Sequence, residues 1–110
     1  MALNNKNRLK NKSDFDKVFK KGRAVKSSFL FIKYVKNELD APRFGFVVSA
    51  KVAGKAVERN KIRRIISEAA GRVIDYLDGY DIIVFATHKI TAAPKGDIAE
   101  DLLNVLKKIQ

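Results

Sequence analysis

The chain has 110 residues, of which 46% are hydrophobic, and its formal net charge at pH 7 is +11. This length suits a single domain with one core. The absence of cysteine excludes disulfide bonds and thiolate metal sites. The one histidine, His88, has no second histidine with which to bind a metal. Residues 1–12 are rich in Asn and Lys without an apolar run, so we expect neither a signal peptide nor a membrane segment. We therefore expect the protein to be cytoplasmic.

The first predicted element is a short helix over about residues 14–21. Ser13 and Asp16 have the spacing of a capping box, in which the Ser13 hydroxyl would accept a hydrogen bond from the amide of Asp16. Gly22 follows the helix and predicts a left-handed C-terminal cap.

Two strands are predicted next, over residues 29–36 and 44–49, because both runs are rich in β-branched and aromatic residues. The turn-like segment 37–42 between them predicts an antiparallel hairpin. Both runs are apolar at neighbouring as well as alternate positions, so neither face of the sheet should meet only water. We expect helices on one face and a ligand on the other.

A helical period begins near Ala56, and seven cationic side chains between Lys51 and Arg72 are predicted to lie on the polar face of this helix. Its apolar arc is formed by Ile62, Ile65, Ile66, Ala69 and Val73. The turn residues Asp78 and Gly79 predict its end. A buried strand over 81–86 and an amphipathic helix after Pro94 complete an α+β pattern in which helices pack on one small mixed sheet.

The positive charge is concentrated in the first two thirds of the chain. Residues 1–72 hold 19 Lys and Arg against 6 Asp and Glu, whereas residues 73–110 hold 4 against 6. Such asymmetry is typical of nucleic-acid-binding proteins, because Lys and Arg side chains placed on phosphates release counterions. A membrane-surface protein is disfavoured by the lack of an aromatic-rich basic helix, and a DNA-binding protein by the lack of a helix-turn-helix partner.

No protein active site is predicted. The sequence offers no nucleophile with a nearby base, no metal-ligand spacing and no Gly-rich phosphate loop. Asp75, Asp78 and Asp81 are better explained as helix-end and turn residues than as ligands of a two-metal nuclease.

The order of these pieces along nearly the whole chain resembles the bacterial ribonuclease P protein component. The pieces that carry the resemblance are Arg8-Leu9-Lys10, Phe15-Asp16-Lys17-Val18-Phe19, Phe29-Leu30-Phe31-Ile32-Lys33-Tyr34, Arg43-Phe44-Gly45-Phe46-Val47-Val48-Ser49, Ala56-Val57-Glu58-Arg59-Asn60-Lys61-Ile62-Arg63-Arg64 and Gly79-Tyr80-Asp81-Ile82-Ile83-Val84. The resemblance implies a two-layer α+β sandwich with a mixed four-stranded sheet, in the order α-β-β-β-α-β-α, similar to a ribosomal protein domain. It also implies a left-handed crossover between the strand ending near Ser49 and the strand at 81–86, where chirality rules alone predict a right-handed one.

The resemblance further implies a function. The protein would be the non-catalytic subunit of a ribonucleoprotein that removes the 5′ leader from precursor tRNA, with the chemistry carried out by the RNA subunit and its Mg²⁺. Its partners would be the ribonuclease P RNA, in a one-to-one complex, and the precursor tRNA, and the protein itself would bind no cofactor or metal. A structural ribosomal protein or a general RNA chaperone is the alternative, since either would share the charge and the lack of catalysis.

Site residues follow from the same resemblance. The basic helix residues that would face the catalytic RNA are Arg59, Asn60, Lys61, Arg63 and Arg64, with Lys61 in a position where the family usually has Arg. The residues that would line the leader cleft, between the first helix and the sheet, are Phe15, Phe19, Tyr34, Ser49 and Lys51. Arg8 and Lys10 would belong to a basic, flexible N-terminal arm over residues 1–12.

Each assignment has a purely structural alternative. The basic residues of the helix could serve only to keep an exposed face soluble. Phe15 and Phe19 are one helical turn apart, so at least one of them is expected to pack into the core. Ala50 stands where the family commonly has a second Lys, and Ala53 is one extra residue before Gly54, so the match of Lys51 could shift by one position.

Overall fold

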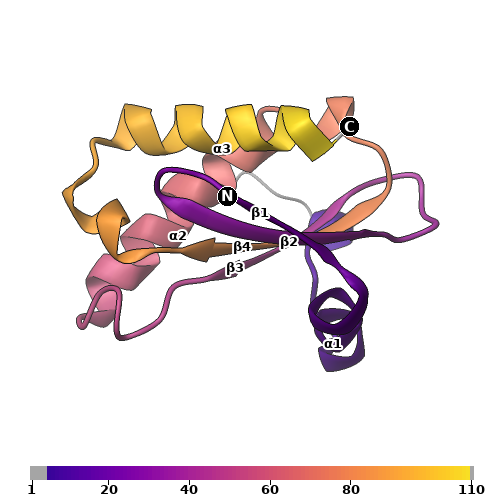
Figure 1. Cartoon of the computed structure of the whole chain (residues 1–110), viewed down its shortest axis with the longest axis horizontal. Coiled ribbons are helices and arrows are strands. Elements are labelled where there is room, and N and C mark those ends of the chain that lie inside the picture. The colour runs from indigo at the N-terminus through magenta and orange to yellow at the C-terminus, as the bar shows by residue number, and fades with distance from the viewer. Residues whose placement is uncertain (1–4, 110) are drawn as a thin grey trace.

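A computed structural model describes residues 5–109 of the chain (Figure 1). The regular elements follow one another as 3-10 helix η1 (Asn5–Asn7), α1 (Lys12–Lys21), β1 (Arg23–Lys26), β2 (Leu30–Lys36), β3 (Arg43–Val47), α2 (Ala56–Gly71), η2 (Ile74–Tyr76), β4 (Tyr80–Ala86), η3 (His88–Ala92) and α3 (Lys95–Ile109). This is the α+β order α-β-β-β-α-β-α. No helix within the described range is long and apolar enough to cross a membrane.

The four strands form one mixed sheet in the order β1-β2-β4-β3. β4 lies between β2, to which it is antiparallel, and β3, to which it is parallel; Val84, for example, pairs with Ile32 on one side and with Phe46 on the other. The predicted hairpin between residues 29–36 and 44–49 is therefore wrong. β4 is apolar and almost wholly buried, so it is the strand that requires a neighbour on each side.

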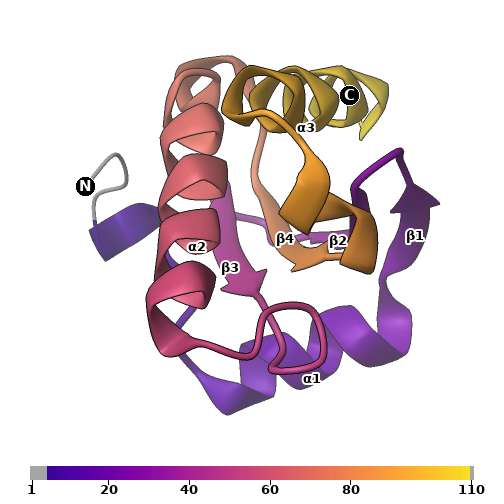
Figure 2. The same cartoon turned by 90° about the vertical axis from the view of Figure 1, so that its left-hand side faces the viewer.

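The two faces of the sheet pack against different helices (Figures 1 and 2). α2 and α3 cover one face, whereas α1 crosses the other. Alternate residues of β4 divide between them: Ile82 and Val84 belong to the core beneath α2 and α3, and Ile83 packs with Val18 of α1. α1 leaves part of its face of the sheet uncovered.

The connection from β3 through α2 to the parallel strand β4 has an uncommon hand. Viewed from the side of α2 with both strands pointing up, β4 lies to the left of β3, so the crossover is left-handed (Figures 1 and 2). About 98% of such connections are right-handed. The hand implied by the family resemblance is thus present, and the one expected from general chirality is not.

The ends of α1 differ from the prediction. The N-cap is Asn11, which makes no side-chain capping hydrogen bond, so Ser13 and Asp16 do not form a capping box. Gly22 has φ of −73° and ψ of 151°, which is extended backbone rather than a left-handed cap. Glycine is needed there because a Cβ would lie 2.3 Å from the carbonyl oxygen of Val18.

α2 is shorter than its apolar period predicted. It ends at Gly71, so Val73 lies beyond it, in the turn that leads to η2. β1 was not predicted from its own residues, because its burial pattern is almost uniformly exposed and gives no alternation to detect. It pairs as an edge strand with β2.

Glu38, in the loop between β2 and β3, has φ of 61°, a left-handed conformation that costs a non-glycine residue about 1 kcal/mol. We expect Glu38→Gly to raise the free energy of unfolding by roughly 0.5 kcal/mol, since the greater freedom of glycine in the unfolded chain offsets part of that relief. The same change at Glu100, which lies exposed in α3, should lower it by about 1 kcal/mol. Urea unfolding of both variants measures the difference, and equal effects would contradict strain at Glu38.

Candidate nucleic-acid interface

A groove of about 540 Å³ runs along the outer edge of β3, between α2 and the segment that precedes α1. The residues that line it come from four parts of the chain and are Arg8, Leu9, Lys10, Phe15, Phe44, Gly45, Phe46, Asn60, Arg63, Arg64, Ser67 and Glu68. Four of these carry a positive charge and one a negative charge. The groove is therefore suited to an extended polyanion.

The α2 wall of the groove contains three of the predicted basic-helix residues, Asn60, Arg63 and Arg64. They share one face because positions three and four apart in a helix are neighbours. The guanidinium of Arg63 donates a hydrogen bond to the amide oxygen of Asn60, which holds the two side chains together. Arg64 is exposed to solvent.

The other two predicted helix residues do not line this groove. Nη1 of Arg59 donates hydrogen bonds of 2.9 Å to the carbonyl oxygens of both Ala53 and Gly54, so this guanidinium fastens the preceding loop to α2. Lys61 is exposed on another flank of α2, beside Ile90 of η3. The sequence prediction that all of these cations share one face is wrong.

The segment before α1 forms the opposite wall. The amide of Leu9 donates a 2.8 Å hydrogen bond to the carbonyl oxygen of Phe44, and the side-chain amide of Asn7 donates to the carbonyl oxygen of Pro42. Leu9 is buried, which fixes its neighbours Arg8 and Lys10 in the groove. Within the arm predicted over 1–12, Asn7 and Leu9 are therefore packed against the fold, while Arg8 and Lys10 remain exposed; residues 1–4 lie outside the described residues.

Phe15 borders the groove and packs on β3 directly over Gly45. A Cβ at Gly45 would lie 2.7 Å from two atoms of the Phe15 ring, so glycine is what allows the ring to approach the strand. Phe15 is half-buried and packs with Leu9 and Val18 in the smaller core cluster. Of the two predicted cleft aromatics on α1, Phe15 is the one that packs into the core.

Phe19 belongs to an aromatic cluster, defined here as Phe19, Phe31 and Phe85, on the face of the sheet that α1 crosses. The ring of Phe85 lies 5.8 Å from that of Phe19 and 5.7 Å from that of Phe31, measured between centroids. Nζ of Lys33 lies 5.8 Å from the centroid of the Phe19 ring. Phe19 is 42% exposed, so its ring presents an aromatic surface to solvent with the cation of Lys33 beside it.

Sequence reasoning missed Phe31, Lys33 and Phe85 and chose Tyr34 in their place. Tyr34 lies on the other face of the sheet, where its ring makes an edge contact with Tyr80 at 5.9 Å, so it does not line a cleft beside α1. Because side chains alternate along a strand, Phe31 and Lys33 point to the opposite face from Tyr34. The pairing of Phe31 with Phe85 across β2 and β4 would have identified the cluster once the register was known.

Ser49 and Lys51, the remaining predicted cleft residues, are exposed in the loop that follows β3. The carbonyl oxygen of Ser49 accepts hydrogen bonds from the amides of Val52 and Ala53, which form a turn before α2. Lys51 is therefore not part of the basic helix, although its charge lies close to where α2 begins.

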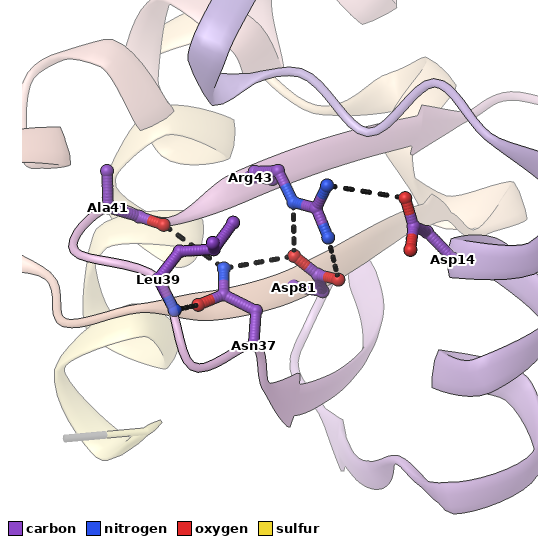
Figure 3. A network of polar contacts seen from close by, with 6 residues as sticks. All are labelled: Asp14, Asn37, Leu39, Ala41, Arg43 and Asp81. Carbon is purple, nitrogen blue, oxygen red and sulfur yellow. Dashed lines mark hydrogen bonds and ion pairs between the residues drawn. The ribbon is translucent and has the colours of Figure 1, made fainter.

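An ion-pair network anchors α1 to the end of the sheet where β4 begins (Figure 3). Nε and Nη2 of Arg43 donate to the two carboxylate oxygens of Asp81 at 2.8 and 2.7 Å, and Nη1 lies 3.3 Å from Oδ2 of Asp14 on α1. Asn37 also donates to Asp81, at 3.0 Å. The hydrogen bonds with Asp81 raise the pKa of Arg43 above its ordinary value, against the opposing effect of burial.

The groove and the aromatic cluster are both suited to binding nucleic acid. Among residues 5–109, no group of three or more His, Cys, Asp or Glu side chains lies close enough together to hold a metal ion. The cationic groove suits phosphates, and the aromatic cluster suits the faces of unpaired bases. The two surfaces meet along α1, which contributes Phe15 to the groove and Phe19 to the cluster.

The chain is similar in sequence and in structure to the members of one known protein family. The family model described as Ribonuclease P matches residues 3–110. The ribonuclease P protein component of Clostridioides difficile (strain 630) is 40% identical over 110 residues, covering 98% of this chain and 96% of that protein, and that of Thermotoga maritima is 32% identical over 114 residues, covering 99% and 97%. Among solved structures, the Staphylococcus aureus RNase P protein superimposes with a TM-score of 0.87 at 34% identity, covering 94% of this chain and 95% of that one.

Proposed function

The chain belongs to the ribonuclease P protein family and functions with an RNA partner in processing the 5′ end of tRNA, and from this premise we propose how its surfaces divide that work. The protein binds one ribonuclease P RNA and the 5′ leader of the precursor tRNA, and the RNA subunit carries out the Mg²⁺-dependent hydrolysis. The protein contributes binding and orientation, which stabilise the complex in which the RNA acts.

The observation that carries this proposal is the position of the cationic groove and the aromatic cluster on either side of α1. Folded RNA presents a phosphate backbone, whereas a 5′ leader is single-stranded and exposes base faces as well. A ribonucleoprotein subunit that holds both needs a cationic wall and a stacking surface next to each other. A general RNA chaperone needs the charge alone.

We assign the groove residues Asn60, Arg63 and Arg64, together with Arg8 and Lys10, to the backbone of the catalytic RNA. Lys61 adds general attraction from another flank of α2, because an ammonium is a point charge without the bidentate geometry of guanidinium. Ser49 and Lys51 lie on the approach to α2 and are proposed as outer leader contacts.

We assign the leader to the aromatic cluster, with Phe19 as its most accessible ring. Stacking of an unpaired base on an aromatic side chain is worth about 1 to 3 kcal/mol and tolerates most base sequences. We expect Phe19→Leu to weaken binding of a leader-bearing precursor about fivefold or more while binding of mature tRNA stays unchanged. Fluorescence titrations of the holoenzyme with both RNAs test this, and an equal loss for both RNAs would contradict it.

The proposed function is tested by multiple-turnover cleavage of a precursor tRNA by a bacterial ribonuclease P RNA at low Mg²⁺, with and without this protein. We expect the protein to accelerate cleavage and to make the complex prefer precursor over mature tRNA. Tight, salt-sensitive binding to unrelated RNAs without stimulation of cleavage would instead indicate a structural ribosomal protein or an RNA chaperone.

A further inference from the structure

We infer that Asp14 is a positioning residue for the aromatic cluster: its ion pair with Arg43 sets where α1 lies on the sheet and so where the ring of Phe19 meets that of Phe85. This inference rests on the proposed function. It assigns a role to a contact that touches no RNA itself.

The ion pair depends on Arg43, whose guanidinium is held in place by the buried carboxylate of Asp81. Asp81 is 2% exposed, and both of its carboxylate oxygens accept hydrogen bonds from the Arg43 guanidinium. The side chain of Asn37 donates to the same carboxylate and to the carbonyl oxygen of Ala41, which ties the β2–β3 loop into the network (Figure 3). A guanidinium held in two places has little freedom left, so its third nitrogen points in a defined direction.

That third nitrogen, Nη1, meets Asp14 near the start of α1 (Figure 3). The side chains of Asp14 and Arg43 are 24% and 22% exposed, so the pair lies at the margin of the core, where it can act as a directional contact. Asp14 and Phe19 lie five residues, or about 7.5 Å, apart along the same helix. Because both residues belong to one helix, a tilt of α1 at its Asp14 end changes the angle at which the Phe19 ring meets Phe85.

The other contacts of α1 leave this tilt to the ion pair. Val18 is fully buried but is one point of contact, and Phe15 packs over Gly45, where glycine presents a smooth strand surface. At the far end, Nζ of Lys33 donates a 3.3 Å hydrogen bond to the carbonyl oxygen of Phe19, an exposed contact that is easily replaced by water. Asp14 instead makes a directional polar contact with a guanidinium that the buried Asp81 holds in place.

The decisive variant is Asp14→Asn, which removes the charge and keeps the shape of the side chain. The two readouts are the affinity of the holoenzyme for a precursor with a leader of several nucleotides and its affinity for mature tRNA. Asp16→Asn is the matched control, because Asp16 lies exposed on α1 and the change in charge is identical. The melting temperature of Asp14→Asn should fall by no more than about 4 °C, since exposed pairs contribute little.

General electrostatics and a positioning role predict opposite signs for the change in affinity for the precursor. Removal of a negative charge beside bound RNA should leave affinity unchanged or raise it, and this is the result expected for Asp16→Asn. The positioning role predicts that Asp14→Asn lowers affinity for the precursor about fivefold relative to mature tRNA. It also predicts that the loss disappears when Phe19→Leu is already present, because both changes act through the same stacking contact.

The outcomes separate the two proposals. If the unaltered holoenzyme does not distinguish precursor from mature tRNA, the proposed function fails and this inference fails with it. If it does distinguish them and Asp14→Asn behaves like Asp16→Asn, or if its loss adds in full to that of Phe19→Leu, only the positioning role of Asp14 is overturned.

Discussion

Replacement of Arg63 and Arg64 together by alanine is expected to lower the affinity for ribonuclease P RNA by one to two orders of magnitude at about 0.1 M salt. Both side chains line the groove beside β3, where Arg8 and Lys10 stand opposite them. Each guanidinium that neutralises a phosphate releases counterions, so the slope of log affinity against log salt should become shallower by about 1.4 to 1.8 for the pair. Arg59 is left unchanged because its guanidinium holds the loop at Ala53 and Gly54.

The matched control is Lys107→Ala/Lys108→Ala, which removes the same charge from exposed positions at the end of α3. Filter binding of the RNA over a range of salt concentrations gives both the affinity and the slope. If the two double variants lose the same affinity, the groove contributes only net charge and is not the binding surface. A loss confined to the α2 variant, with an unchanged melting temperature, supports the groove as the site.

Charge and periodicity together predicted the basic helix well but could not resolve its faces. The predicted set placed Arg59 and Lys61 on the same RNA-facing surface as Arg63, although it noted that Lys61 stands where the family usually has Arg. The structure differs because Arg59 finds two carbonyl oxygens in a loop whose shape the helical period does not describe. The arm residues Arg8 and Lys10 join the same groove through a backbone bridge to β3, a long-range pairing that local sequence does not encode.

The pairing of the strands in the sheet could likewise not be predicted from local sequence. Strand positions followed from composition, and the bounds of β2, β3 and β4 came within two residues of those predicted. The pairing of the strands did not follow from composition. β4 lies between β2 and β3 because it is the strand that buries most apolar surface on both faces. Tyr34 lies three positions along the strand from Phe31, and because side chains alternate with a period of two, this odd offset placed the predicted aromatic on the other face of the sheet.

Gly79→Ala is expected to lower the free energy of unfolding by about 3 kcal/mol, because an added Cβ would meet backbone that cannot yield cheaply. It would lie 1.9 Å from the carbonyl oxygen of Leu39 and 2.5 Å from the side-chain oxygen of Asn37. Gly79 also accepts a 2.9 Å hydrogen bond from the amide of Asn37, so any shift that relieves the clash would stretch this contact.

The displacement caused by Gly79→Ala should reach the aromatic cluster through the polar network around Asp81. Asn37 donates to Asp81, Asp81 holds Arg43 and Arg43 meets Asp14, so a displaced β2–β3 loop weakens the anchor of α1 (Figure 3). Urea unfolding should show the loss of stability, while Gly96→Ala, whose Cβ would meet nothing within 4 Å, should be neutral or up to about 1 kcal/mol more stable. At a temperature where Gly79→Ala remains folded, its preference for precursor over mature tRNA should still be reduced. An unchanged free energy of unfolding would mean that the β2–β3 loop adapts freely to the added Cβ. It would also mean that Asn37 does not hold Asp81 in place.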